Sequence, residues 1–300
     1  MTVSHTRART LAIVALLAGA TCIGTSALFV KVSEAGPVST AFWRVFLALP
    51  FLWAWAWMDQ RGAVTTTAPA TQGGSGKLLF AAGFFFAGDL AVWHWSIVLT
   101  SVANAVLLAN LAPIFVTLAA WWLWRKNPTL MFLAGLATAL AGVMLMVGGD
   151  FSHTSGRAVL GDALGVVTAM FYAAYQLTVT RLRGTVSTAR IMAMSSVVTA
   201  AFLLPIAWLS GEVFFPVTGA GWTKVFALAL ISQVAGQSLI AYAMAHLPAT
   251  LSSVGLLLQP VMASLFAWIL LGETLGAVAI AGAALVLIGI RIATQVEIKP

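Results

Sequence analysis

Apolar residues dominate long stretches of the chain, and polar residues gather in the short segments between them. About 20 consecutive apolar residues form a helix long enough to cross the hydrocarbon layer of a bilayer. Stretches of this kind predict helices over residues 11–32, 38–58, 78–99, 103–124, 129–148, 159–180, 188–209, 222–245, 249–271 and 275–293. The pattern therefore predicts an all-α integral membrane protein with ten transmembrane helices.

The first span begins like a secretory signal peptide, because Arg7 and Arg9 precede an apolar run. The apolar pattern continues through residues 23–32 without a clear cleavage site of small residues. We therefore expect an uncleaved first transmembrane helix.

The composition agrees with a membrane protein, since only 8% of residues are charged against roughly 25% in a typical soluble domain. The net charge of +7 would suit a nucleic-acid-binding protein, but the basic residues lie at the ends of the spans and form no long cluster. With the N-terminus in the cytoplasm, the inner segments carry Arg7, Arg9, Arg61, Lys77, Arg125, Lys126, Arg181, Arg183, Arg190, Arg291 and Lys299. The outer segments carry only Lys31, Arg157 and Lys224. The positive-inside rule predicts that both termini are cytoplasmic, and we expect the lipid bilayer, not nucleic acid, as the surroundings of this chain.

Several kinds of site are excluded by the residues present. Cys22 is the only cysteine, so no internal disulfide and no cysteine-based metal site can form. The sequence contains neither H-E-x-x-H nor the phosphate-binding G-x-x-x-x-G-K-[ST] motif. We therefore expect no metal, no cofactor and no direct drive by ATP.

The two halves of the sequence repeat each other. An offset of 147 residues overlays Pro113 on Pro260, Gly135 on Gly282 and Gly142 on Gly289. Each copy holds five helices, an odd number, so the second copy enters the membrane in the opposite orientation. We predict two inverted five-helix repeats, residues 1–150 and 151–300, with a substrate site near the bilayer midplane between them. The paired glycines lie seven residues apart on one helix face, where we expect close helix packing.

Three segments carry a family resemblance: LTSVANAVLLANLAPIF in the first copy, GDALGVVTAMFYAAYQLTVTR opening the sixth span, and HLPATLSSVGLLLQPVMASLFAWILLGETLGAVAIAGAALVLIG in the second copy. Through them the chain resembles the drug/metabolite transporter superfamily, in particular the ten-helix EamA-type exporters. The second copy has the motif Gly272-Glu273-Thr274, whereas the first has Trp124-Arg125-Lys126 at that place. The resemblance implies export of amino acids or similar metabolites across the bacterial inner membrane. The tryptophan-rich first half is most similar to the aromatic amino-acid exporters of the YddG type.

Asp89 lies about eleven residues into the third span, which places it near the middle of the membrane at roughly 1.5 Å per residue. A carboxylate at that depth is by default a functional-site hypothesis. At helical spacing Asp89 shares one face with Phe85, Trp93, Ser96 and Thr100, and we expect this face to line a cavity. Trp93 could stack on a ring or cover a cationic group of the substrate.

Two further charged or titratable groups lie within spans. His94 is about 140° around the helix from Asp89, so the two cannot point along the same radius. His94 either makes an interhelical hydrogen bond or takes part in transport. Arg44 lies just inside the second span, as a charge at the outer mouth or as part of an ion pair.

Polar side chains interrupt the apolar sixth and eighth spans. They are Tyr172, Tyr175 and Gln176 in the sixth span and Gln233, Gln237 and Tyr242 in the eighth. Pairs four residues apart present two hydrogen-bonding groups on one face. We expect these groups to line the cavity and bind a substrate with ammonium and carboxylate groups; the alternative is hydrogen bonding between helices.

Pro113 and Pro260 fall about ten residues into their spans, where proline removes a backbone hydrogen bond and kinks a helix. The kinks are either hinges or fixed features of shape. Asn110 lies beside the first kink and Gln259 beside the second, and we include Asn110 among the expected cavity residues.

The sequence thus favours a secondary carrier, acting as a monomer, that exports amino acids or related small metabolites by alternating access. The driving force is either the substrate's own gradient or protons carried by Asp89 or His94. The alternatives are an exporter of cationic drugs or other metabolites, a channel, and an intramembrane enzyme. Against an enzyme, Asp89 is the only carboxylate in mid-span, although a Ser-His pair that uses His94 stays open.

Overall fold

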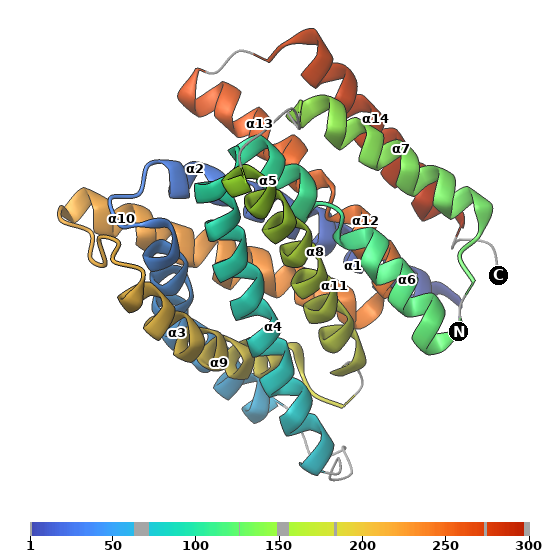
Figure 1. Ribbon diagram of the computed structural model, residues 1–300. Helices are drawn as coiled ribbons and strands as arrows, with labels where there is room; N and C mark the ends of the chain where they lie inside the picture. Colours follow the sequence, from blue (N-terminus) through green and yellow to red (C-terminus); the bar gives the residue numbers. More distant parts are fainter. Residues whose placement is uncertain are drawn as a thin grey trace.

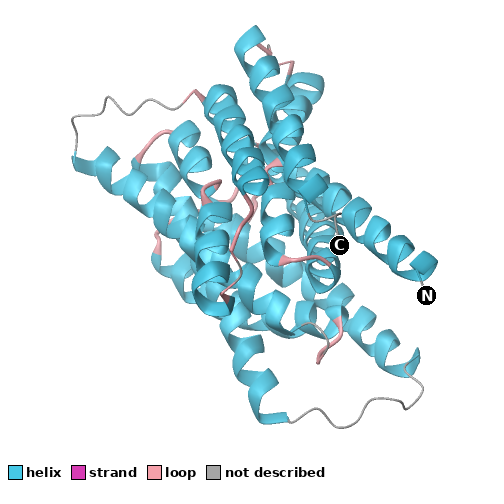
Figure 2. Cartoon of the chain, turned by 90° about the vertical axis from the view of Figure 1, so that its right-hand side faces the viewer, coloured by secondary structure: helices cyan, strands magenta, loops and turns pink. Residues whose placement is uncertain are grey.

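The computed structural model describes residues 2–62, 72–125, 127–148, 156–182, 185–272 and 275–296. Within these ranges the regular structure is entirely helical, without strands (Figure 2). Ten segments are long and apolar enough to cross a membrane, which confirms the predicted number of spans. The predicted boundary between residues 150 and 151, as well as Lys126, Arg183, Glu273, Thr274 and Lys299, lies outside the described residues.

The helices of the first half are α1 (Thr2–Gly24), α2 (Ser26–Lys31), α3 (Pro37–Gly62), α4 (Gln72–Leu99), α5 (Val102–Ala109), α6 (Ala112–Trp124) and α7 (Leu130–Val147). Those of the second half are α8 (Gly156–Leu182), α9 (Thr188–Leu209), α10 (Gly219–Leu228), η1 (Ala229–Gln237), α11 (Ser238–His246), α12 (Ala249–Gly255), α13 (Leu258–Leu271) and α14 (Ala277–Val296). Several spans are therefore built from more than one helical segment (Figure 1).

The spans that contain Pro113 and Pro260 are interrupted near these prolines, where the sequence predicted kinks. The breaks fall between α5 and α6 and between α12 and α13. Both prolines lie in the first turn of the restarted helix. Proline fits there because the first N–H groups of a helix have no intrahelical partner. In each span one helix therefore ends before the proline, and the next helix begins one or two residues before it.

The eighth span contains a π-helix, η1, between α10 and α11. Its backbone bonds join each residue to the fifth residue along, so each turn holds more residues than a turn of an α-helix. Gln233 and Gln237 both fall in this segment. The two residues are still about one turn apart, but the turn is π-helical and not the α-helical turn that the sequence predicted.

Helices α7 and α14 cross with their backbones in contact, on one side of the bundle (Figure 1). A Cβ atom added to Gly142 would lie 2.5 Å from the carbonyl oxygen of Gly282, and one on Gly135 would lie 2.8 Å from that of Gly289. The repeat maps the first of these contacts onto the second. The four repeated glycines thus pack as expected, and α7 and α14 meet as equivalent helices of two inverted repeats.

The two halves are tied together on the face opposite the chain ends. Glu34, after α2, accepts hydrogen bonds from the backbone N–H and the hydroxyl of Thr218 at 2.9 and 2.5 Å, at the start of α10. Glu212, after α9, accepts a bond of 3.0 Å from the first turn of α3. The indole of Trp43 donates to the carbonyl of Phe214 at 2.7 Å. Each glutamate therefore caps a helix of the other half.

Candidate functional site

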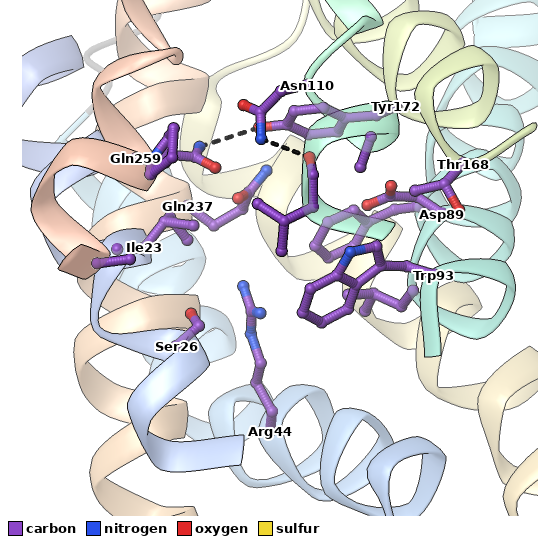
Figure 3. Close-up of a pocket in the computed structure, with 17 residues that line it drawn as sticks. Ile23, Ser26, Arg44, Asp89, Trp93, Asn110, Thr168, Tyr172, Gln237 and Gln259 are labelled. Carbon is purple, nitrogen blue, oxygen red and sulfur yellow. Dashed lines mark hydrogen bonds between the residues drawn. The ribbon is translucent and has the colours of Figure 1, made fainter. Parts of the chain in front are cut away.

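A cavity of about 180 Å³ lies between the two halves. The first half contributes residues of α1 to α5 and Asn110, and the second contributes residues of α8, η1 and α13 (Figure 3). One water molecule needs only about 10–15 Å³ of space measured in this way, so the cavity holds several water molecules. The cavity therefore suits a small solute.

Arg44 and Asp89 carry opposite charges into this cavity. Arg44 extends into it from α3, and Asp89 lies beside Thr168 on another wall (Figure 3). The side chain of Arg44 is 8% exposed, and its Nε atom has no hydrogen-bond partner among the described residues. Although their charges interact, the two groups form no direct ion pair in the described part of the chain. A buried charge is costly unless it has a partner of opposite charge. Arg44 and Asp89 are therefore each placed to bind a charged group of a solute.

The packing of α4 on α8 accounts for the position of Asp89. Gly88 has no side chain, and a Cβ atom there would lie 2.5 Å from the ring of Phe171. The close approach of the two helices places the next residue, Asp89, in the wall of the cavity that Thr168 of α8 also lines (Figure 3). Trp93, one turn along α4, lines the same cavity.

Neutral hydrogen-bonding groups form the rest of the polar lining. The amide of Gln259 donates to the hydroxyl of Tyr172 at 3.5 Å, and Asn110 donates to the carbonyl of Val106 at 2.8 Å (Figure 3). The amide of Gln237 donates to the hydroxyl of Tyr175 at 3.0 Å. These groups keep free acceptor or donor capacity for a bound solute.

The cavity therefore brings together Asp89, Trp93, Asn110, Tyr172 and Gln237 of the expected residues, together with Pro260. His94, Tyr175, Gln176, Gln233 and Tyr242 lie outside its lining, as does Pro113. Tyr175 supports the site from behind, since it holds Gln237 and stacks on Phe86 with ring centroids 4.9 Å apart.

Three of the residues outside the lining contact other parts of the protein. The Nδ1 atom of His94 bonds the carbonyl of Leu90 in its own helix, and its buried Nε2 atom has no hydrogen-bond partner among the described residues. Gln233 donates to Ser196 at 3.4 Å. The ring of Tyr242 packs on that of His246 with centroids 4.3 Å apart.

The expected polar face of α4 is divided between two environments. Asp89 and Trp93 line the cavity, but Ser96 donates to the carbonyl of Gly161 at 2.7 Å and Thr100 to Asp162 at 2.6 Å. The part of this face near the C-terminal end of α4 therefore makes hydrogen bonds to α8 and does not line the cavity.

The sequence did not assign Arg44, Thr168, Ser26 and Gln259 to the cavity, where all four lie. Arg44 gave a signal, because a charge within an apolar span is costly unless it serves a site. Thr168 and Ser26 gave none, because isolated hydroxyl residues are common in transmembrane helices and bond to neighbouring helices. Among the described residues, no three His, Cys, Asp or Glu side chains gather as a metal site would require.

The model of the EamA-like transporter family matches residues 10–148 and again residues 159–295. The chain belongs to the EamA-like transporter family. This EamA-like transporter carries the family unit twice, and its ten spans make it a multi-pass membrane protein.

Individual relatives support this assignment. The EamA-like transporter is 27% identical over 255 residues to an uncharacterized transporter of Archaeoglobus fulgidus, covering 83% of this chain and 85% of the relative. It is 26% identical over 212 residues to the pseudopaline exporter CntI of Pseudomonas aeruginosa, covering 70% and 72% of the two chains. One crystal structure matches with a TM-score of 0.75 at 20% identity, over 97% of this chain and 99% of the other, which shows the shared fold.

Proposed function

We propose that this transporter exports small zwitterionic metabolites, foremost amino acids with neutral or aromatic side chains, across the bacterial inner membrane. The observation that carries the proposal is the pair of opposite charges, Arg44 and Asp89, on separate walls of one small cavity. A guanidinium binds a carboxylate, and a carboxylate binds an ammonium group. An amino acid carries both.

The surrounding groups fit the remainder of such a substrate. Trp93 and Tyr172 offer aromatic surface, which supports the aromatic amino acids within this class. Gln237 and Gln259 supply neutral hydrogen-bonding groups. Arg44 disfavours a cationic drug, because a second positive charge in the cavity is repelled by the first.

Direction and mechanism follow from the family and the repeat. A relative named as an exporter supports outward transport. Exchange of conformation between two inverted repeats would expose the cavity to each side in turn, within one chain. The bias of basic residues toward one side supports cytoplasmic termini.

Counterflow of radiolabelled amino acids in proteoliposomes tests the proposal. We expect saturable uptake that unlabelled neutral amino acids compete. Hydrogen bonds to charged groups contribute about 1.5–3 kcal/mol, so Arg44→Gln and Asp89→Asn should each weaken apparent affinity by about 10- to 100-fold. Lys224→Gln is the matched control, since Lys224 lies outside the cavity lining.

Substrate analogues identify which charge binds which group. An amino-acid amide lacks the carboxylate, so it should compete poorly in the wild type yet lose no further affinity in Arg44→Gln. A hydroxy acid lacks the ammonium group and should behave likewise with Asp89→Asn. Uptake no greater than in protein-free liposomes for every amino acid would refute the proposed substrate class.

A further inference from the structure

Helix α8 carries a row of polar side chains at intervals of four residues: Thr168, Tyr172, Gln176 and Thr180. Residues four apart lie on one side of a helix, about 40° further round at each step. Thr168 and Tyr172 line the central cavity. Gln176 and Thr180 lie beyond it, toward the end of α8 that is on the same side as the chain ends. We call the four residues the polar row.

The deeper members of the polar row are buried without partners. Gln176 is 1% exposed and Thr180 is 7% exposed. Neither polar atom of the Gln176 amide, nor the hydroxyl of Thr180, has a hydrogen-bond partner among the described residues. Thr178, on another side of the same helix and 8% exposed, donates to the carbonyl of Ala174 at 2.7 Å. A threonine hydroxyl of similar burial in the same helix therefore does find a hydrogen-bond partner.

Neighbouring helices add further groups of the same kind. Helix α8 packs against α11 and α12. Ser238 at the start of α11 is 8% exposed, Ser252 in α12 is fully buried, and neither hydroxyl has a partner among the residues that the structure describes. Buried polar groups are nearly always hydrogen-bonded in native proteins, and an exception needs a physical reason. Buried polar atoms without partners also occur elsewhere among the described residues, for example in Ser39 and His94. Gln176 and Thr180 differ from these because they continue the row of Thr168 and Tyr172 that lines the cavity.

We propose that the polar row is the translocation route between the central cavity and the side of the membrane that holds the chain ends. Gln176 and then Thr180 hydrogen-bond the polar groups of the solute and its accompanying water when this side opens. In the present structure the route is closed, because Gln176 and Thr180 are both buried. The inference rests on the proposed transport function and adds the residues that the substrate meets beyond the cavity.

The single cysteine makes this route testable by labelling. In a Cys22→Ser background, Gln176→Cys and Thr180→Cys each provide one thiol, and Thr178→Cys is the control of matching burial in the same helix. A small, permanently charged methanethiosulfonate is added to one side of the membrane at a time. From the side of the chain ends, Gln176→Cys and Thr180→Cys should react at least tenfold faster than Thr178→Cys. A neutral amino acid should change the first two rates and not the third.

The outcomes separate the route from the substrate class. If both test cysteines react as slowly as Thr178→Cys, or only from the opposite side, the route is wrong even where amino-acid counterflow succeeds. If they react rapidly but amino acids change no rate and show no counterflow, the route stands and the proposed substrate class fails.

Hydrogen exchange on the unmodified protein tests the route even if a cysteine variant does not fold. Substrate should change the exchange of backbone amides over residues 176–182 more than over α9. Equal change in the two segments would overturn the route.

Discussion

A side chain at the crossing of α7 and α14 should destabilise the protein, because the backbones of the two helices touch there. In Gly142→Ala, the new Cβ would lie 2.5 Å from the carbonyl oxygen of Gly282 and 2.6 Å from the backbone nitrogen of Val286. Ordinary contact begins at 3.4 Å, so the helices must part by 3.4 minus 2.5, or 0.9 Å. Both obstructing atoms are backbone atoms, which cannot rotate away. Overpacking of this kind costs about 1–3 kcal/mol.

Equilibrium unfolding in mixed micelles, followed by tryptophan fluorescence, measures this loss. Gly219→Ala is the control, since a Cβ at this first residue of α10 would meet no atom within 4 Å. We expect Gly142→Ala to lose about 1–3 kcal/mol of unfolding free energy and Gly219→Ala to lose none. A Gly142→Ala protein as stable as the wild type would show that the helices are not in backbone contact.

A double substitution tests the pairing itself. The structure places Gly142 against Gly282, so one separation of the helices makes room for both new methyl groups. Gly142→Ala with Gly282→Ala should therefore cost less than the sum of the two single changes. Full additivity would contradict direct pairing.

Three further predictions concern polar contacts. Hydrogen bonds from Thr218, the side chain first, lower the pKa of Glu34 below its ordinary value of 4.5, so the stabilisation is present above that pH and is lost as pH falls below it; Glu34→Gln should flatten the acid limb of melting temperature against pH. Trp43→Phe removes the bond to the Phe214 carbonyl and should lower the unfolding free energy by about 0.5–1.5 kcal/mol, measured by denaturant titration, whereas no change would deny that bond a role. Asp162→Ala removes the acceptor of the Thr100 hydroxyl and should lower the melting temperature, and an unchanged value would contradict this tie between α4 and α8.

The spans could be predicted from the sequence because the bilayer imposes their length and apolar character. The glycine crossing could also be predicted, since Gly135 and Gly142 recur at the same spacing in the second half. The breaks before Pro113 and Pro260 and the π-helix could not. These features depend on which backbone groups find partners in neighbouring helices, and local sequence leaves that open.

The site was only partly predictable for a related reason. Asp89 is conspicuous because a carboxylate in an apolar span is costly to bury and is rarely kept without a functional role. Gln176 and Gln237 show the same pattern in the sequence, a glutamine in an apolar helix, but only Gln237 lines the cavity. Which of them does so depends on the rotation of α8 and on the π-helix, and both are set by packing.

The two halves share a backbone plan but divide the chemistry of the cavity unequally. Arg44 and Asp89 both come from the first half, while the second half supplies neutral groups such as Thr168, Tyr172 and Gln237. When the halves exchange conformations, both charges stay with the first repeat. The inward-facing and outward-facing states therefore present different surroundings to the solute. The half-saturation concentrations on the two sides of the membrane should therefore differ, although the final distribution of solute is still fixed by the gradients alone.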